Sequence, residues 1–214
     1  MTGKTHLAVG IASALCLTQP ETPRELVLCL SASAVGSMIS DIDVTTSDSR
    51  EALNRITLLA GAAILLAGIA EIRLDLGIVR NFDRQSSGFR LAVGLAAFWL
   101  VCAFGKNQPH RSFMHSFAGI AALTGILALI YPPVVPYFMT AMISHTAIDL
   151  LNRRKVRLLY PLKWGFCFGV CSSDGWVDRK LFLAGCIAGV LAFALAGGRY
   201  LSGLGGIPFL PGQS

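Results

Sequence analysis

The residues best suited to chemistry in this sequence are four histidines and several aspartates, which fall into short motifs. The first motif is Ser144-His145-Thr-Ala-Ile-Asp149. Residues four apart lie on the same face of an α-helix, so this imidazole and this carboxylate can bind one cation or two adjacent ones. A buried His–Asp pair can equally be a structural hydrogen bond, and the motif alone leaves both interpretations open.

The second motif is Pro109-His110-Arg111-Ser-Phe-Met-His115. Two histidines five apart do not align on an ideal helix. We therefore expect His110 on a loop and His115 in the first turn of the following helix, with Pro109 at the helix entrance. Arg111 lies between them, and its planar guanidinium can hold an anionic substrate oxygen. The alternative role for Arg111 is a contact with solvent or a lipid headgroup.

A third motif, Ser40-Asp41-Ile42-Asp43, supplies two carboxylates. In an extended stretch, residues two apart point the same way, so both carboxylates are expected to face one site. Oxygen ligands beside imidazoles suit zinc, manganese or another borderline divalent metal. Turn formation is the alternative, since aspartate favours such positions. His6 adds an imidazole in the first turn of the first apolar run.

The composition indicates that lipid surrounds much of the chain. The 214 residues are 54% hydrophobic and 14% charged, with a mean hydropathy of +0.62, whereas soluble domains are about 25% charged. Seven apolar segments are visible, at 5–18, 26–40, 56–70, 91–105, 116–131, 134–149 and 181–198. Most are shorter than the roughly 20 residues that cross a hydrocarbon core, but seven of them between short charged loops favour spanning helices.

We therefore predict an all-α, multi-spanning transmembrane bundle of about seven short helices. It forms a single membrane-embedded domain over residues 1–198, followed by a poorly ordered tail over 199–214 that is rich in Gly and Pro. The proline pair Pro132-Pro133 is expected to separate the fifth helix from the sixth. The apolar run after His6 lacks a good cleavage site and is predicted to be a retained helix. The six cysteines are scattered and indicate no disulfide framework.

Passing the seven segments alternately through a bilayer brings the motifs together. The second segment returns to the N-terminal side just before Asp41, the fourth returns before His110, and the sixth ends with His145 and Asp149. We therefore predict one metal site at one end of the bundle. Its candidate ligands are His6, Asp41, Asp43, His110, His115, His145 and Asp149. This number suggests two ions, or one ion whose imidazoles are oriented by the remaining groups.

Charge gives the expected orientation. The net charge is +6, and alternate threading puts twelve of the 18 Lys and Arg residues on the side of the metal site, which predicts that this side faces the cytoplasm. No Arg-rich stripe with interleaved aromatics occurs, so no nucleic-acid partner is expected. The basic stretch 153–157, followed by Tyr160 and Trp164, is typical of a membrane-surface anchor or of a wall of the site.

Taken together, these motifs resemble a known family. The order His6-Leu, Ser-Asp41-Ile-Asp43, His110-Arg-Ser-Phe-Met-His115-Ser, Ser-His145-x-x-x-Asp149 and Leu-Tyr160-Pro-Leu-Lys-Trp resembles the YdjM-type inner-membrane metal-dependent hydrolases. That family is placed near the zinc-dependent phospholipase C and single-strand nuclease superfamily. This chain departs from the family pattern after Asp149, where Asn152-Arg-Arg-Lys155 replaces a Thr-Pro-containing turn. The departure puts the substrate, rather than the metal ligands, in doubt.

The resemblance implies hydrolysis of a phosphoester or another ester. The expected cofactor is one or two divalent ions, with zinc first and manganese second, and the expected substrate is an anionic, lipid-like molecule reached from the bilayer of the inner membrane. The expected catalytic groups are Asp43 or Asp149 as general base and Arg111 as a stabiliser of developing charge. The alternative is a metal-ion transporter or a metal-sensing membrane protein that uses the same cluster. The oligomeric state is left open.

Overall fold

The computed structural model describes residues 1–44, 51, 54–55 and 87–205. Its α-helices are α1 (Gly3–Thr18), α2 (Pro23–Ile39), α4 (Ser87–Lys106), α5 (Phe117–Ile130), α6 (Val135–Leu150) and α7 (Trp176–Gly205). Three short 3₁₀ helices join or extend them: η1 (Ser40–Asp43), η2 (Phe113–His115) and η3 (Pro132–Val134). The described ranges contain no strand beyond isolated bridges, and the all-α prediction is confirmed. The predicted segment 56–70 lies outside the described residues.

Local sequence signals set several helix ends. The Thr22 side chain caps α2 by accepting a hydrogen bond of 3.2 Å from the Glu25 N–H, with Pro23 in the first turn. At the other end of the preceding helix, Gln19 adopts a left-handed conformation that stops α1. The break predicted between the fifth and sixth helices is present, since Pro132 and Pro133 lie in η3.

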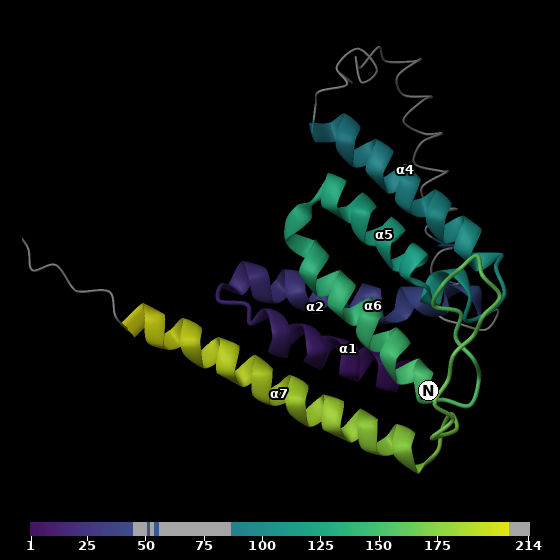
Figure 1. The fold of residues 1–214 in the computed structure, drawn as a ribbon. Helices are drawn as coiled ribbons and strands as arrows, with labels where there is room; N and C mark the ends of the chain where they lie inside the picture. Colours follow the sequence, from purple (N-terminus) through teal and green to yellow (C-terminus); the bar gives the residue numbers. More distant parts are fainter. Residues whose placement is uncertain (45–50, 52–53, 56–86, 206–214) are drawn as a thin grey trace, which may run out of the picture.

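Three helices cross closely at the centre of the bundle. Helix α1 packs against α2, α6 and α7, while α5 lies between α4 and α6 (Figure 1). A Cβ atom on Gly36 of α2 would lie 2.6 Å from the carbonyl oxygen of Phe138 in α6, and one on Gly10 of α1 would overlap the Ser37 hydroxyl. The absence of side chains at Gly10 and Gly36 therefore lets these backbones approach one another, as is common between helices in membranes.

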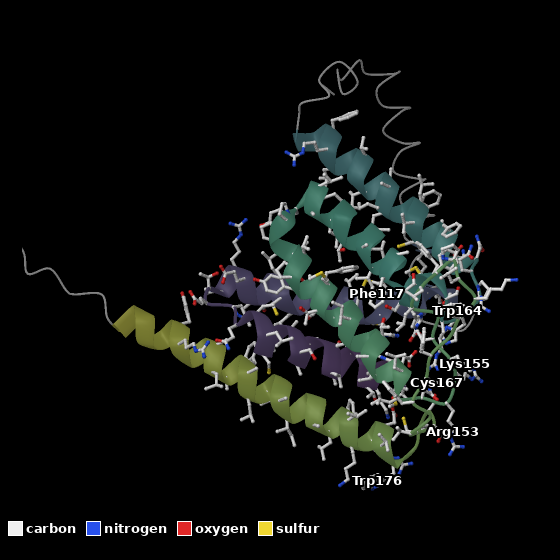
Figure 2. The ribbon with its side chains drawn as sticks, in the orientation of Figure 1. Phe117, Arg153, Lys155, Trp164, Cys167 and Trp176 are labelled. Carbon is white, nitrogen blue, oxygen red and sulfur yellow. The ribbon has the colours of Figure 1, made fainter. Side chains whose placement is uncertain are left out.

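The helices alternate in direction, as the threading required. Figure 1 shows the first residues of α1, α5 and α7 at the same end of the bundle as the last residues of α2, α4 and α6. The connecting segment 151–175, which joins α6 to α7, also lies at this end, and Figure 2 shows its side chains there. We call this the site end.

The helices differ in how well they suit a bilayer. Three ranges are long and apolar enough to cross a membrane: Pro23–Asp43, Gly88–Lys106 and Trp176–Tyr200. Helices α1, α5 and α6 have 16, 14 and 16 residues. Large apolar side chains are exposed along α4 and α7, among them Leu91, Leu95, Leu100, Leu183, Val190 and Leu195. Lipid tails can cover such faces. Helix α7 continues to Gly205, past residue 198, where the predicted domain ended.

The close crossing generates a stability prediction. Gly36→Ala should destabilise the protein in detergent by about 1–3 kcal/mol, because its Cβ meets backbone atoms that cannot move aside. Gly125→Ala in α5 is the control, since a Cβ at that position meets nothing within 4 Å. Thermal unfolding of the two variants checks this prediction, and equal midpoints would contradict it.

Candidate metal centre

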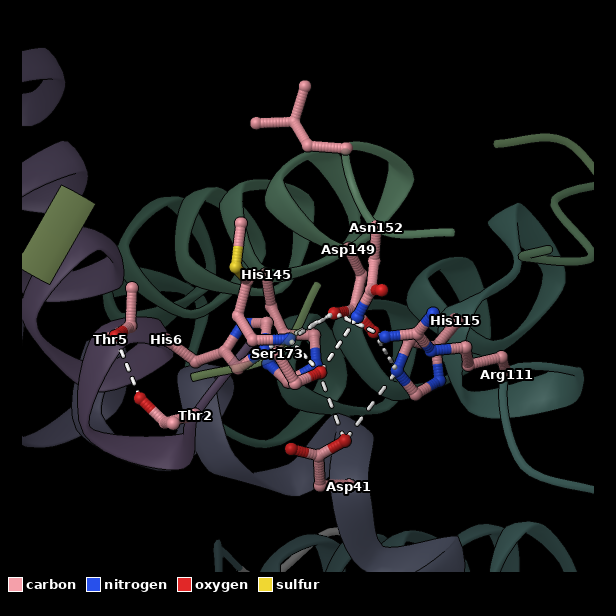
Figure 3. Close-up of polar contacts among 12 residues, drawn as sticks. Thr2, Thr5, His6, Asp41, Arg111, His115, His145, Asp149, Asn152 and Ser173 are labelled. Atoms are coloured by element: carbon pink, nitrogen blue, oxygen red, sulfur yellow. Dashed lines mark hydrogen bonds and ion pairs between the residues drawn. The ribbon is translucent and has the colours of Figure 1, made fainter. Parts of the chain in front are cut away.

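The predicted ligands come from five elements that meet at the site end. His6 lies in the first turn of α1, Asp41 and Asp43 lie in η1 at the end of α2, and His115 ends η2. His110 lies in the loop before η2, and His145 and Asp149 lie in the last two turns of α6. The structure brings all seven side chains together; Figure 3 shows five of them: His6, Asp41, His115, His145 and Asp149.

Two local predictions were wrong. Residues Ser40–Asp43 form a 3₁₀ helix rather than an extended stretch, although both carboxylates reach the histidines. Asp41 lies beside His115 and His145, and Asp43 lies beside His110, with its Oδ2 4.0 Å from His115 Nδ1. In addition, α5 begins at Phe117, after a Ser116 cap. His115 therefore precedes that helix, and Pro109 does not mark its entrance.

The spacing between imidazoles and carboxylates matches that of ligands sharing an ion. The Nε2 atoms of His6 and His115 each lie 3.4 Å from an Asp149 oxygen, and His145 Nε2 lies 3.6 Å from Asp41 Oδ1. These separations exceed a good hydrogen bond. Two ligand atoms at zinc distances of about 2.0–2.1 Å are about 3.4 Å apart in a tetrahedral site.

Three overlapping groups of residues have ligand atoms within 4.8 Å of one another. They are His6, Asp41 and His145; Asp41, His110 and His115; and His115, His145 and Asp149. Asp41, His115 and His145 each occur in two groups. Shared ligands of this kind are compatible with one ion or with two adjacent ions.

Unpartnered nitrogens support the same conclusion. His145 Nε2 and both ring nitrogens of His115 are buried and have no hydrogen-bond partner among the described residues. A buried polar atom without a partner costs free energy, and native structures contain few of them. The donor set of imidazole nitrogens and carboxylate oxygens is one that divalent ions accept. The residues therefore fit a metal ion.

The His145 ring is oriented from behind by the backbone of α2. Its Nδ1 atom lies 2.6 Å from the carbonyl oxygen of Ser37. Because a carbonyl only accepts, Nδ1 carries the proton, and in the neutral ring Nε2 presents its lone pair toward Asp41. The His6 ring stacks on His145, with centroids 3.6 Å apart. This arrangement is typical of a metal-binding histidine held by an outer partner.

Asp43 is placed to orient His110. Its Oδ1 accepts a hydrogen bond of 2.8 Å from His110 Nδ1, and its Oδ2 accepts one of 3.2 Å from the Arg111 backbone N–H. None of the three ligand groups found among the described residues includes Asp43. A carboxylate that orients an imidazole in this way leaves the other ring nitrogen for a ligand.

Arg111 connects the carboxylates of Asp43 and Asp149. It is buried and adopts a left-handed backbone conformation, with φ of 62°. While its backbone N–H binds Asp43, its guanidinium donates 2.8 Å to Asp149 Oδ1 and 2.9 Å to the Arg154 carbonyl oxygen. Such a conformation costs of the order of 1 kcal/mol in a residue other than glycine, and it persists where surrounding bonds determine it.

Four of the seven candidate ligands line a cavity of about 210 Å³. Its wall contains Met1, His6, Asp41, Val44, His110, Arg111, Asp149, Arg154 and Ser173. Sequence reasoning missed Ser173, which lies in the irregular segment 151–175 and has no periodic pattern or motif around it. Sequence reasoning did not single out Arg154 either. It named only the basic stretch 153–157 that contains this residue, and that stretch was the signal that could have found it. Asn152, which is buried, donates a hydrogen bond of 3.0 Å to Ser173 Oγ.

Comparison with known proteins identifies the family. A family model described as YdjM inner membrane protein matches residues 1–204. The chain belongs to this family. The matched range contains every motif of the cluster, and the family description agrees with the apolar helices in placing the chain in an inner membrane. No curated protein and no solved structure matches the chain significantly. Membership of the YdjM family thus indicates a location in the inner membrane, and the family description names no catalytic activity.

The cluster generates a metal-binding prediction. Purified protein is expected to contain a divalent metal, and Asp41→Asn and His145→Gln should each lower the bound metal at least about tenfold, because each removes a ligand that two groups share. Asp174→Asn is the matched control, since Asp174 is exposed at the site end outside the cluster. Elemental analysis by mass spectrometry checks this, and equal metal content in all four proteins would contradict it.

A separate prediction concerns Asp43. If this carboxylate orients His110 rather than binding the ion, Asp43→Asn should weaken metal affinity by about 10–100-fold while leaving the saturating stoichiometry unchanged. Titration of metal-free protein with Zn²⁺ distinguishes the two roles. A lower stoichiometry at saturation would show that Asp43 is itself a ligand.

Proposed function

We propose that this protein is a membrane-bound metal-dependent hydrolase that cleaves a phosphoester or another ester of an anionic, lipid-like substrate. One observation carries the proposal: buried imidazoles with unpartnered nitrogens lie together with carboxylates at one end of a membrane bundle, where His6 and Asp149 also line a cavity. Ionisable groups in membrane proteins are costly and are retained chiefly for function.

The proposed ligands are His6, Asp41, His110, His115, His145 and Asp149, holding one or two ions. Zinc is the first candidate and manganese the second, because the set mixes imidazole with carboxylate. A divalent ion bound there supplies an activated water at neutral pH and polarises the scissile ester. The protein contributes the orientation of the rings, through Ser37 behind His145 and Asp43 behind His110.

Among the carboxylates, Asp149 is the better-placed proton acceptor. It lines the cavity, and its hydrogen bonds from Arg111 and the Met1 ammonium reach Oδ1 alone, whereas both oxygens of Asp43 accept hydrogen bonds. In the proposed reaction Asp149 takes a proton from the attacking water. Arg111 stabilises the negative charge that develops on the substrate; it lines the same cavity, and its Nε has no partner among the described residues.

The position of the cluster supports a hydrolase over a transporter. A transporter places its ion ligands near the bilayer midplane, on a path open alternately to both sides. Here His6 lies in the first turn of α1 and Asp149 in the last turns of α6. The excess of basic residues at the site end supports a cytoplasmic orientation of the cavity.

The proposal predicts turnover that depends on Asp149. The purified, metal-loaded protein in detergent should release phosphate or alcohol from generic phosphoester or ester substrates. Compared at equal metal content, because Asp149 is also a proposed ligand, Asp149→Asn should lower kcat by at least about 100-fold, since it removes the proton acceptor. Asp174→Asn should retain the wild-type rate. Metal flux in liposomes without turnover on any substrate would contradict the proposal and favour a transporter.

A further inference from the structure

The segment 151–175, together with the first residues of α5 and α7, presents an unusual set of exposed apolar side chains. Figure 2 shows Trp164 and Trp176 of this set at the site end. Trp164 is 68% exposed, Phe168 71% and Trp176, the first residue of α7, 73%. The set also includes Phe117, Leu159, Leu162, Phe166 and Val170. We call these eight side chains, with the basic residues between them, the platform. Exposed apolar patches of this kind mark interaction surfaces.

The same segment is strongly basic. Between Leu150 and Ser173 the sequence has no acidic residue, and it has five basic ones: Arg153, Arg154, Lys155, Arg157 and Lys163. Figure 2 shows Arg153, Lys155, Trp164 and Trp176 at the same end of the molecule. Aromatic and basic side chains that alternate in this way suit the headgroup region of a bilayer, where rings sit at the interface and cations meet lipid phosphates.

Backbone hydrogen bonds hold the platform against the bundle. Val156 and Phe166 exchange two hydrogen bonds, of 2.8 and 2.9 Å, and the Phe168 N–H donates 2.7 Å to the Leu150 carbonyl at the end of α6. The Phe117 N–H, at the start of α5, donates 3.0 Å to the Leu158 carbonyl. The apolar side chains are therefore displayed outward by a tethered backbone.

A hollow of about 390 Å³ lies within the platform. Its wall contains Leu150, Lys155, Leu158, Gly165, Phe166, Cys167 and Phe168. The wall is apolar except for Lys155, which is the arrangement expected for a surface that accepts part of an acyl chain beneath an anionic headgroup. A protein partner would have to supply acidic side chains together with an apolar segment, whereas an anionic leaflet supplies both chemistries at once.

We propose that the platform docks on the bilayer interface, with its aromatic and aliphatic side chains at the boundary between headgroups and acyl chains and its lysines and arginines on anionic lipid phosphates. Continuity with the membrane supports this assignment. Helix α7, which is long and apolar enough to span, begins at Trp176, and the Lys180 ammonium lies over the Trp176 ring at 4.7 Å. The platform therefore joins a spanning helix at its interfacial end.

The platform also borders the metal cluster. Arg154 belongs to the platform, lines the 210 Å³ cavity, and accepts a hydrogen bond from Arg111 through its carbonyl oxygen. Docking at headgroup level would bring lipid phosphates to the mouth of that cavity. This consequence for the substrate rests on the hydrolase function proposed above, while the docking itself does not.

Depth-dependent fluorescence quenching tests the docking directly. In a Trp99→Phe/Trp176→Phe variant, Trp164 is the remaining tryptophan. Reconstituted in nanodiscs of phosphatidylcholine and phosphatidylglycerol, it should be quenched most by lipids brominated near the glycerol end of the chains, and weakly by iodide in solution. A Trp164→Phe/Trp176→Phe variant keeps Trp99 of α4 as the control, which deep bromines should quench. Iodide quenching of Trp164 without bromolipid quenching would overturn the proposal, leaving the surface to water or a protein.

Lipid selectivity tests the charged part of the platform. Added phosphatidylglycerol should raise the thermal midpoint of the detergent-solubilised protein more than phosphatidylcholine does, and Lys155→Gln/Lys163→Gln should at least halve that difference. The control Arg24→Gln/Arg90→Gln removes two charges at the opposite end of the bundle and should leave the difference unchanged. An equal response in the two double variants would overturn the proposal. Neither readout involves turnover, so failure here is distinct from failure of the hydrolase function.

Discussion

The hydrogen bond of 2.6 Å between His145 and the Ser37 carbonyl is the interaction on which the site depends. It joins α6 to α2 where the two helices cross, and the absence of a side chain at Gly36 allows their close approach there. One helical turn beyond each partner lies a carboxylate, Asp149 after His145 and Asp41 after Ser37. A single contact between two helices therefore fixes one imidazole and sets the positions of two carboxylates. The orientation of the ring and the placement of the carboxylates thus follow from backbone packing.

Much of the site could be predicted because two kinds of regularity cooperate. Helical spacing puts His145 and Asp149 on one face, and alternate threading puts the ends of distant segments on one side of the bundle. The described helices run in the expected directions, and His6, weak evidence by itself, stacks on His145. These features depend on the number and direction of the apolar segments, and the hydropathy of the sequence indicates both. The helix expected at 56–70 is outside the described residues, and the predicted number of seven stays a prediction.

The parts that could not be predicted depend on the conformation of a few residues. How Asp41 and Asp43 approach the histidines depends on whether Ser40–Asp43 is extended or a 3₁₀ helix, and four residues at a helix end are too few for a hydropathy period to distinguish these conformations. Arg111 joins Asp43 and Asp149 through a left-handed backbone that the sequence does not indicate. Ser173 reaches the cavity through an irregular segment whose path is set by its own hydrogen bonds.

The size of the cavity beside the His/Asp cluster has a consequence for how the proposed substrate is encountered. At about 210 Å³ it is smaller than the roughly 300–1,000 Å³ pockets that enclose drug-sized ligands. Of the lipid-like ester proposed above, only a headgroup-sized part fits inside it, so the remainder of the molecule would stay in the bilayer. For such a substrate the relevant concentration is its mole fraction within the leaflet. Dilution by other lipids would then slow an enzyme of this design, whereas dilution of the membranes in buffer would not.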